Sequence, residues 1–367
     1  MKIFILAGEK SGDNYGALLC KNLKKLKRDI IILGTGGKEM EKEGVEIIKS
    51  NLFGIMGFSG VIKRIVPYYI FLKKVLKRIK EENPDLIIFI DNPAFNLRIA
   101  ERLRKRYRTC YYIPPKIWAY HKYNIKILRK YIDFVIPIFP FEKDIYEKEN
   151  IPNFYFGHPF IDLIKNESEI LSEKEQDEYL IGILPGSRKE EVKYNLPVMM
   201  KVAEILNKEK KTRILISASE SKIEKIIKNI TKNFKLEYSI IDDLYKIIKS
   251  SDVVLAVSGT VNLEVAYFEK PMIVFYKTSI LNYLLAKWKV KLKMISPVNI
   301  VVGRKIVPEY VQNFKIVEVV ESLKELLNKG LLYIKEINGF KKLKETFKEK
   351  NVSEKIAKFI IEGILKC

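Results

Sequence analysis

Residues 183–200, ILPGSRKEEVKYNLPVMM, run from an apolar stretch through Pro-Gly-Ser-Arg into a charged stretch that can form a helix. Gly186 and Ser187 would leave backbone N–H groups bare at the start of that helix, with Arg188 beside them. Such a turn after a strand suits an anion, most simply a phosphate. These residues therefore predict a strand, a phosphate-binding turn and a helix.

The same alternation recurs along the whole chain. Apolar runs alternate with helical patterns in the first half, at KIFILA, IIILGTGG, DLIIFIDNP, TCYYIPP and FVIPIFP, and again in the second, at YLIGILPGSR, RILISAS, DVVLAVSGT and PMIVFYK. Strands alternating with helices predict parallel sheets of the doubly wound type. We therefore expect an α/β fold of two Rossmann-like domains facing a central cleft, joined by the polar stretch 166–178, with ligands at the carboxyl ends of the strands.

Composition narrows the function only coarsely. The 367 residues contain 67 Lys and Arg against 45 Asp and Glu, a net charge of +22. That excess suits nucleic acid, an anionic membrane surface or phosphorylated substrates, and it also suits a merely lysine-rich composition. Three widely separated cysteines and two histidines argue against a zinc site, and no apolar run is long enough to span a bilayer. We expect a cytoplasmic enzyme that contacts the membrane.

Two turns in the first half follow apolar strands. In AGEKSGDNYGA, residues 7–17, Gly8, Ser11 and Gly12 allow a tight turn with free N–H groups, although such a turn is more often structural. In IDNPAFN, residues 90–96, Asp91 stands where Pro93 prevents the strand from continuing. Its carboxylate could act as a general base or cap the next helix, and position alone favours the cap.

Two further motifs lie in the second half. VSGTVNLE, residues 257–264, offers Ser258, Gly259 and Thr260 to a diphosphate and Glu264 to ribose hydroxyls, or forms a capping box. SPVNIVVGRKIVPEYVQ, residues 296–312, carries Asn299 and Gln312, which the residues alone do not distinguish from surface polar groups.

Two segments, 61–80 and 280–295, combine aromatic, aliphatic and basic residues at helical spacing. A helix with an apolar face and flanking lysines can lie in a membrane interface. Periodicity does not separate this interpretation from an ordinary helix packed on its own sheet.

Together and in this order, the motifs resemble the lipid-A-disaccharide synthase family: AGEKSGD, IMGF, IDNPAFN, IWAY, PFEKDIYEKENIP, FGHPFID, LPGSR, SGTVNLE, PMIVFYK and VGRKIVPEYVQ. The resemblance implies an inverting GT-B glycosyltransferase that uses no metal or other cofactor. Its reaction joins UDP-2,3-diacylglucosamine to the 6-hydroxyl of 2,3-diacylglucosamine 1-phosphate (lipid X). The products are UDP and the β-1,6 disaccharide 1-phosphate, a step in making the lipid A of Gram-negative lipopolysaccharide.

The resemblance also implies roles for residues and segments. Asp91 would be the base. The UDP side would comprise Gly186, Ser187, Arg188, Ser258, Gly259, Thr260, Glu264, Asn299 and Gln312. The acceptor side or cleft would comprise Ser11, Gly12, Asp13, Met56 and Trp118. Residues 1–165, rejoined by a last helix at 340–367, would form the acceptor and membrane-side domain, and residues 166–339 the UDP-sugar domain.

The implied partners are the two lipid substrates and the phospholipid surface at the inner face of the inner membrane; a homodimer is compatible with the sequence, and nucleic acid has no role. Ala94, Gly60 and the run His121–Asn124 depart from the family pattern, which bears on acceptor or acyl-chain preference more than on UDP use. From the residues alone, two alternatives stay open: a different UDP-sugar enzyme, such as a 2-epimerase or a transferase with another acceptor, and a basic nucleic-acid-binding protein. The lack of an evident stacking platform argues against the second.

Overall fold

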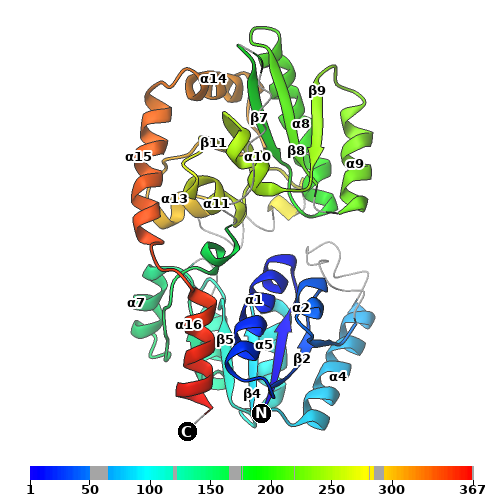
Figure 1. Ribbon diagram of the computed structural model, residues 1–367, viewed down its shortest axis with the longest axis vertical. Coiled ribbons are helices and arrows are strands. Elements are labelled where there is room, and N and C mark those ends of the chain that lie inside the picture. The colour runs from blue at the N-terminus through cyan, green and yellow to red at the C-terminus, as the bar shows by residue number, and fades with distance from the viewer. Residues whose placement is uncertain are drawn as a thin grey trace. The chain divides into compact units, whose positions relative to one another are not determined.

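The computed structural model describes residues 1–49, 65–118, 122–164, 175, 177–218, 220–280, 282–284 and 293–365. The chain divides into two compact units, Met1–Leu163 with Lys348–Cys367, and Ile164–Phe347. Each unit contains a six-stranded parallel sheet with helices on both faces (Figure 1). The α/β doubly wound architecture predicted from the alternating strands and helices is therefore confirmed.

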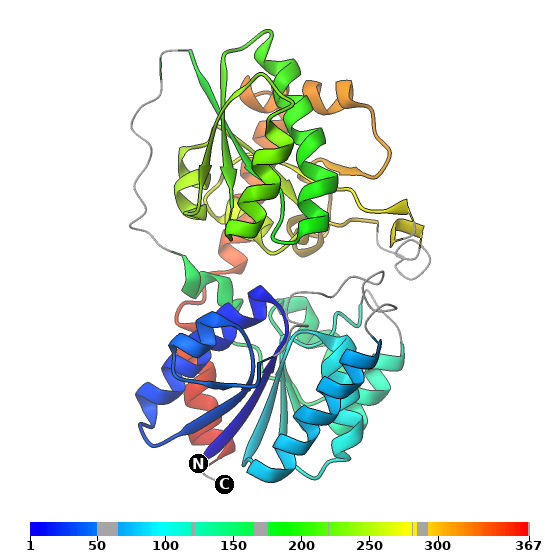
Figure 2. The same ribbon diagram turned by 90° about the vertical axis from the view of Figure 1, so that its right-hand side faces the viewer.

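The first unit is built around the strand order β3-β2-β1-β4-β5-β6. Helices α1 and α16 lie on one face of this sheet, and α4 and α5 lie on the other (Figure 2). Its elements are β1 Lys2–Ala7, α1 Lys10–Leu26, β2 Ile31–Thr35, α2 Lys38–Lys42, β3 Glu46–Ile47, α4 Ile65–Glu82, β4 Leu86–Ile90, α5 Pro93–Leu103, β5 Thr109–Tyr112, α6 Lys122–Tyr131, β6 Phe134–Ile136, α7 Pro140–Lys148, the 3₁₀ turn Pro159–Leu163, α16 Val352–Lys358 and the π-helical turn Phe359–Ile364.

The second unit repeats this arrangement with the order β12-β11-β10-β7-β8-β9. Numbered from its own first strand, that order is the same one, 3-2-1-4-5-6 from the opposite edge, which dinucleotide-binding folds share. Its elements are β7 Tyr179–Leu184, α8 Lys189–Asn207, β8 Thr212–Ser217, α9 Ser221–Thr231, β9 Glu237–Ile241, α10 Leu244–Ser250, β10 Val253–Val257, α11 Val261–Tyr267, β11 Met272–Tyr276, α13 Pro297–Val302, β12 Glu309–Val311, α14 Ile316–Leu327 and α15 Leu331–Thr346.

The apolar runs become strands because both faces of each sheet are covered. All five residues of β4, LIIFI, are buried, as are all five of β10, VVLAV. A central parallel strand between two helix layers must be apolar on both sides, which gives a continuous run and not an alternating one. Each unit has its own apolar core against these strands.

The chain returns to the first unit later than residue 340. Helix α15 runs on to Thr346 and buries Phe340 and Leu343 within the second unit. After it, the Asp162 carboxylate accepts hydrogen bonds from the N–H groups of Val352 (3.1 Å) and Ser353 (2.6 Å) at the start of α16. This cap fastens the last helix to the first unit. Most of the expected linker, 166–178, lies outside the described residues.

Candidate functional site

Both sheets reverse their strand order at corresponding places. In the first sheet β1 lies beside β4, and in the second β7 lies beside β10. Ligands of doubly wound sheets bind at this switch point, outside the carboxyl ends of the strands. The loops that begin there are 8–9 and 91–92 in the first unit, and 185–188 and 258–260 in the second, each followed by a helix. Four of the sequence motifs therefore lie at the two switch points.

Asp91 directly follows β4 and has a left-handed backbone conformation, with φ 49°. A non-glycine residue holds that conformation only where its surroundings fix it. The Asp91 N–H donates to the carbonyl oxygen of Tyr112 (3.2 Å). The Asp91 carbonyl oxygen accepts from Tyr111 Oη and from Asn96 Nδ2, both at 2.7 Å. The backbone is thus fixed while the residue stays partly exposed.

Asn96 is the residue at this site that sequence reasoning missed. Its side chain is buried, and Nδ2 also lies 3.2 Å from the Leu6 carbonyl oxygen and 3.3 Å from that of Ile90. It thereby ties the ends of β1 and β4 together at the switch point. Asn92 is the N-cap residue of α5, and within the described residues its side chain makes no capping hydrogen bond.

The glycine turn after β1 serves mainly packing. A Cβ atom at Gly8 would lie 2.0 Å from Asn92 Nδ2, so only glycine permits this close approach, and Gly12 is buried against Ile90. Ser11 remains partly exposed.

Asp13, expected on the acceptor side or in the cleft, is buried and caps α2. Its Oδ1 accepts from the N–H groups of Gly37 (2.7 Å) and Met40 (3.1 Å), and its Oδ2 from that of Glu39 (3.0 Å). A carboxylate at the start of a helix satisfies N–H groups that have no partner within that helix.

Trp118 also braces the fold. Its Nε1 donates to Glu142 Oε1 at 2.9 Å. The buried Glu142 carboxylate accepts as well from the N–H groups of Ile138 and Phe139, just before α7. Burial raises the pKa of Glu142, and the Trp118 hydrogen bond counteracts part of that rise. Met56, the other predicted cleft residue, lies outside the described residues.

His158 is buried and neutral. Burial, with a smaller contribution from Lys116, lowers its pKa to about 3. The Phe160 N–H donates to His158 Nδ1 at 3.2 Å. The Nδ1 atom of His158 thus has a partner within the protein, while His121 lies outside the described residues.

In the second unit, the expectation of bare N–H groups after β7 is corrected. Glu191 Oε2 accepts from the N–H groups of Ser187 (3.1 Å) and Arg188 (3.3 Å), and Glu191 Oε1 accepts from Arg188 Nη1 (3.1 Å). Gly186 has φ 106°, and a Cβ there would lie 2.5 Å from Glu191 Oε2. The Glu191 carboxylate, which belongs to α8, therefore accepts the hydrogen bonds from the N–H groups that were expected to bind a phosphate. The Arg188 guanidinium, which has five N–H donors, belongs to a side chain that is 41% exposed.

Tyr276 ends β11 within electrostatic reach of this loop. Burial raises the pKa of its hydroxyl, the Glu191 carboxylate raises it further, and Arg188 lowers it. In the sequence, Tyr276 is marked only as an aromatic residue at the end of an apolar run.

At the end of β10, Ser258 Oγ donates to the Ile295 carbonyl oxygen at 2.8 Å. A Cβ at Gly259 would meet nothing within 4 Å among the described atoms, so this turn is open to a ligand. In that part of the structure, Thr260 makes no side-chain capping hydrogen bond, so the capping-box alternative is not supported. Glu264 is buried, which raises its pKa to about 7, while a hydrogen bond with Tyr245 acts to lower it.

Asn299 and Gln312 are engaged with the backbone. Asn299 is fully buried; its Oδ1 accepts from the N–H groups of Ile306 (2.7 Å) and Val307 (3.0 Å). The Asn299 amide therefore braces the loop before β12. The Gln312 amide pairs with both backbone groups of Thr278, at 3.2 and 3.1 Å, and stays partly exposed.

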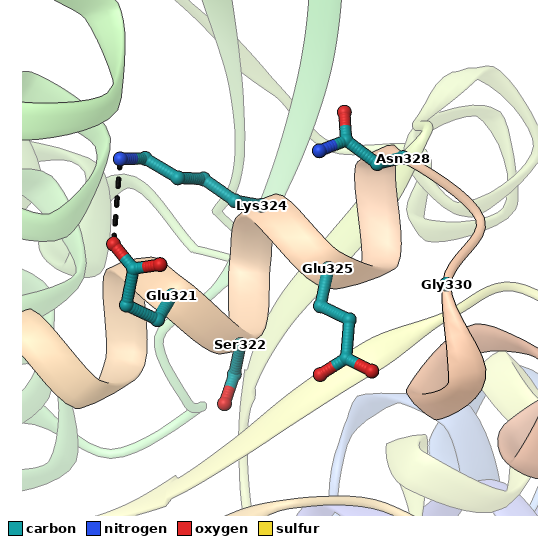
Figure 3. A pocket seen from close by; sticks show the side chains of 6 residues that line it. All are labelled: Glu321, Ser322, Lys324, Glu325, Asn328 and Gly330. Atoms are coloured by element: carbon teal, nitrogen blue, oxygen red, sulfur yellow. Dashed lines mark hydrogen bonds and ion pairs between the residues drawn. The ribbon is translucent and has the colours of Figure 1, made fainter.

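A cavity of about 490 Å³ lies away from the second switch point. It is lined by residues of α14 and the turn after it: Glu321, Ser322, Lys324, Glu325, Asn328 and Gly330 (Figure 3). Lys324 pairs with Glu321 and with Glu209, which follows the carboxyl end of α8 and so lies near the amino ends of the strands. Its paired charges give the cavity no evident ligand chemistry.

Two further properties concern the described residues alone. They contain no group of three or more His, Cys, Asp or Glu side chains placed to hold a metal ion. None of the helices that they form is long and apolar enough to cross a membrane.

Residues 3–360 match the protein family described as lipid-A-disaccharide synthetase. The chain is 32% identical over 321 residues to lipid-A-disaccharide synthase 1 of Legionella pneumophila (strain Paris), covering 85% of this chain and 84% of the relative. It is 34% identical over 330 residues to lipid-A-disaccharide synthase of Persephonella marina, covering 85% of each.

Solved structures with the same two-domain fold include UDP-GlcNAc 2-epimerase from Neisseria meningitidis bound to UDP-GlcNAc. That chain has a TM-score of 0.64 at 15% identity, with 100% of both chains covered. UDP-GlcNAc 2-epimerase from Methanocaldococcus jannaschii, in complex with UDP-GlcNAc and UDP, has a TM-score of 0.63 at 16% identity, covering 98% of this chain and 99% of that one. At such low identity the similarity establishes the GT-B-type fold alone.

Proposed function

Because the chain belongs to the lipid-A-disaccharide synthetase family, we propose that it transfers 2,3-diacylglucosamine from UDP-2,3-diacylglucosamine to the 6-hydroxyl of lipid X. It is a glycosyltransferase of lipid A disaccharide synthesis. The observation that supports this chemistry best is Asp91, a partly exposed carboxylate at a switch point, on a backbone held in a costly conformation. Such strain is typical of catalytic positions.

In this reaction Asp91 acts as the general base. It accepts the proton of the acceptor 6-hydroxyl as that oxygen bonds to the anomeric carbon of the donor sugar. The bond from the anomeric carbon to the UDP oxygen breaks, its electron pair leaves with UDP, and the configuration inverts. A positioned base of this kind typically contributes ~10²–10⁴-fold to the rate. We assign the acceptor to the first unit for this reason.

We assign the nucleotide sugar to the second unit. The Arg188 guanidinium is suited to stabilise the charge that develops on the departing diphosphate. The open turn at Gly259 gives a diphosphate close access to the backbone, and Glu264 is placed to accept ribose hydroxyls once it is ionised. Gln312 and Asn299 then support the site through the loops that they brace.

We further propose contact with the inner face of the inner membrane, because both substrates carry acyl chains, and α4 is suited to that contact. Val66, Tyr69 and Ile70 are exposed by 67%, 43% and 63%. Lys73 and Lys77 continue the same helical face toward the carboxyl end, at spacings of three and four residues. An apolar face flanked by lysines is typical of helices that lie in an anionic membrane interface. The 280–295 segment lies largely outside the described residues.

The test is a product assay. Purified protein is supplied with UDP-2,3-diacylglucosamine and lipid X in detergent, and UDP and disaccharide are quantified by mass spectrometry. We expect one UDP released for each disaccharide 1-phosphate formed. UDP release without disaccharide, or an epimerised donor sugar, would refute the assignment.

A further inference from the structure

Glu309, the first residue of the edge strand β12, collects three hydrogen bonds on one oxygen. Its Oε1 accepts from the N–H groups of Ile295 (3.0 Å) and Ser296 (2.7 Å), and from Asn299 Nδ2 (2.9 Å). A charged acceptor makes stronger hydrogen bonds than a neutral one. The carboxylate therefore fixes residues 295 and 296, which lead directly into α13.

The same peptide is held from its other side by the switch-point turn. Ser258 Oγ donates to the Ile295 carbonyl oxygen, while the N–H of that peptide, which belongs to Ser296, donates to Glu309 Oε1. The Ser258 hydroxyl thus donates its proton to a hydrogen bond within the protein. The position of Ile295, and therefore the shape of the turn that begins at Ser258, depends on the Glu309 carboxylate.

The outgoing chain after β11 is fastened in a similar way. Asn195 bonds both backbone groups of Lys277, its Oδ1 accepting from the N–H (2.8 Å) and its Nδ2 donating to the carbonyl oxygen (3.0 Å). Gln312 does the same for Thr278. Both places where the chain departs from and rejoins this edge of the sheet are therefore set by side chains, which is typical of a site whose loops must be held in one geometry.

We propose that Glu309 is a positioning residue for nucleotide-sugar binding: it acts through Ile295 to fix the Ser258–Thr260 turn at the second switch point. This inference rests on the proposed function, because it takes that turn as the UDP-sugar site. It predicts an effect on the donor and none on the acceptor, since the acceptor is assigned to the other unit.

The chain supplies a matched control beside the neighbouring strand β11, in which Glu309 pairs with Val274. Glu336 in α15 is fully buried, and its Oε2 accepts from the N–H of Met272, the first residue of β11, at 2.8 Å. Both residues are carboxylic side chains that accept backbone N–H bonds in the second unit. Glu336 lies at the amino end of β11, away from the switch point, so its loss should change stability alone.

The experiment compares wild type with Glu309→Ala, Glu309→Gln and Glu336→Ala. For each, the KM for UDP-2,3-diacylglucosamine, the KM for lipid X and the melting temperature are measured. We expect Glu309→Ala to raise the donor KM about tenfold and leave the lipid X KM unchanged, as expected when positioning is lost. Glu309→Gln should recover most of the loss, because its amide oxygen accepts the same bonds. Glu336→Ala should lower only the melting temperature.

The inference is overturned if Glu309→Ala changes only the melting temperature, or if it raises both KM values equally. Should Glu309→Ala not fold, UDP binding by Glu309→Asp decides: a shorter carboxylate cannot reach all three donors, so unchanged affinity contradicts the inference. An inactive wild type that still binds UDP would refute the proposed function and leave the Glu309 comparison measurable by UDP affinity.

Discussion

Asn96 holds Asp91 by its backbone: Asn96 Nδ2 lies 2.7 Å from the Asp91 carbonyl oxygen, in the first turn of α5. The same amide nitrogen lies within 3.3 Å of two other carbonyl oxygens, at the ends of β1 and β4. A single buried side chain therefore joins the two strands of the switch point and fixes the residue assigned as the base.

Replacing Asn96 should therefore reduce turnover. We expect Asn96→Ala to lower kcat about tenfold, because Asp91 loses part of what holds its left-handed conformation. The variant should also lose ~1–3 kcal/mol of unfolding free energy, since buried carbonyl groups lose their partner. Steady-state kinetics and urea unfolding measure both effects.

Asn22→Ala is the matched control in the same unit. Asn22 Nδ2 donates to the Leu18 carbonyl oxygen, one turn earlier in α1. Its removal should leave kcat unchanged. A stability loss in Asn96→Ala with normal kcat would show that Asn96 has no part in positioning the base.

We expect Glu264→Gln to have opposite effects on the stability of the fold and on UDP binding. Burial raises the pKa of Glu264 from 4.5 to about 7. The folded state therefore binds this proton more tightly than the unfolded state, so stability is lost as pH rises from 4.5 to about 7. Above that range the loss is about 3 kcal/mol. Glu264→Gln should unfold at higher urea than wild type at about pH 8, and the difference should vanish at about pH 4.

The same substitution should weaken UDP binding at about pH 8 by roughly tenfold, because an ionised carboxylate is the better acceptor for ribose hydroxyls. Calorimetry at several pH values tests this. The UDP phosphate itself titrates nearby, so the ratio of the two affinities is the useful quantity. A ratio that stays constant from about pH 6 to about pH 8 would exclude Glu264 from the nucleotide site.

The exposed face of α4 predicts membrane contact. We expect the double variant Val66→Ser/Ile70→Ser to reduce co-sedimentation with vesicles of anionic phospholipid at least about tenfold. Each buried side chain of this size is worth about 1.5–3 kcal/mol. Raising the salt concentration should weaken wild-type binding further, since the lysines of α4 interact with the lipid charge.

Val317→Ser in α14 is the control for this prediction. Val317 is exposed by 68%, as much as Val66, but the lysine of α14, Lys324, is paired with Glu209 and Glu321. If both variants bind vesicles alike, α4 is not the membrane-contacting face.

Much of the fold could be read from the sequence because buried parallel strands are continuous apolar runs. The strands β1, β4, β7 and β10, which meet at the switch points, were all predicted. The strands that were missed are edges: β3, β9 and β12. In β9, EYSII, no residue is fully buried, so the strand lacks the signal that marks a central one.

The site was predictable as a set of loops but not as a set of contacts. The alternation of strands and helices places Asp91 and Arg188 at strand ends, and the structure confirms both positions. The sequence pattern could not show that Glu191 accepts hydrogen bonds from the backbone beside Arg188, or that Asp13 caps a helix 25 residues later. Both residues have carboxylates that accept hydrogen bonds from backbone N–H groups. The hydrophobic periodicity of a sequence does not indicate which N–H group a given side chain will reach.

The most direct test of Asp91 as the general base compares wild type with Asp91→Ala. Both are supplied with UDP-2,3-diacylglucosamine and lipid X, while UDP affinity is measured in parallel. We expect the variant to bind UDP as wild type does and to form disaccharide ~10²–10⁴-fold more slowly, because a positioned base is lost. Disaccharide formation at the wild-type rate by a folded Asp91→Ala protein would contradict it.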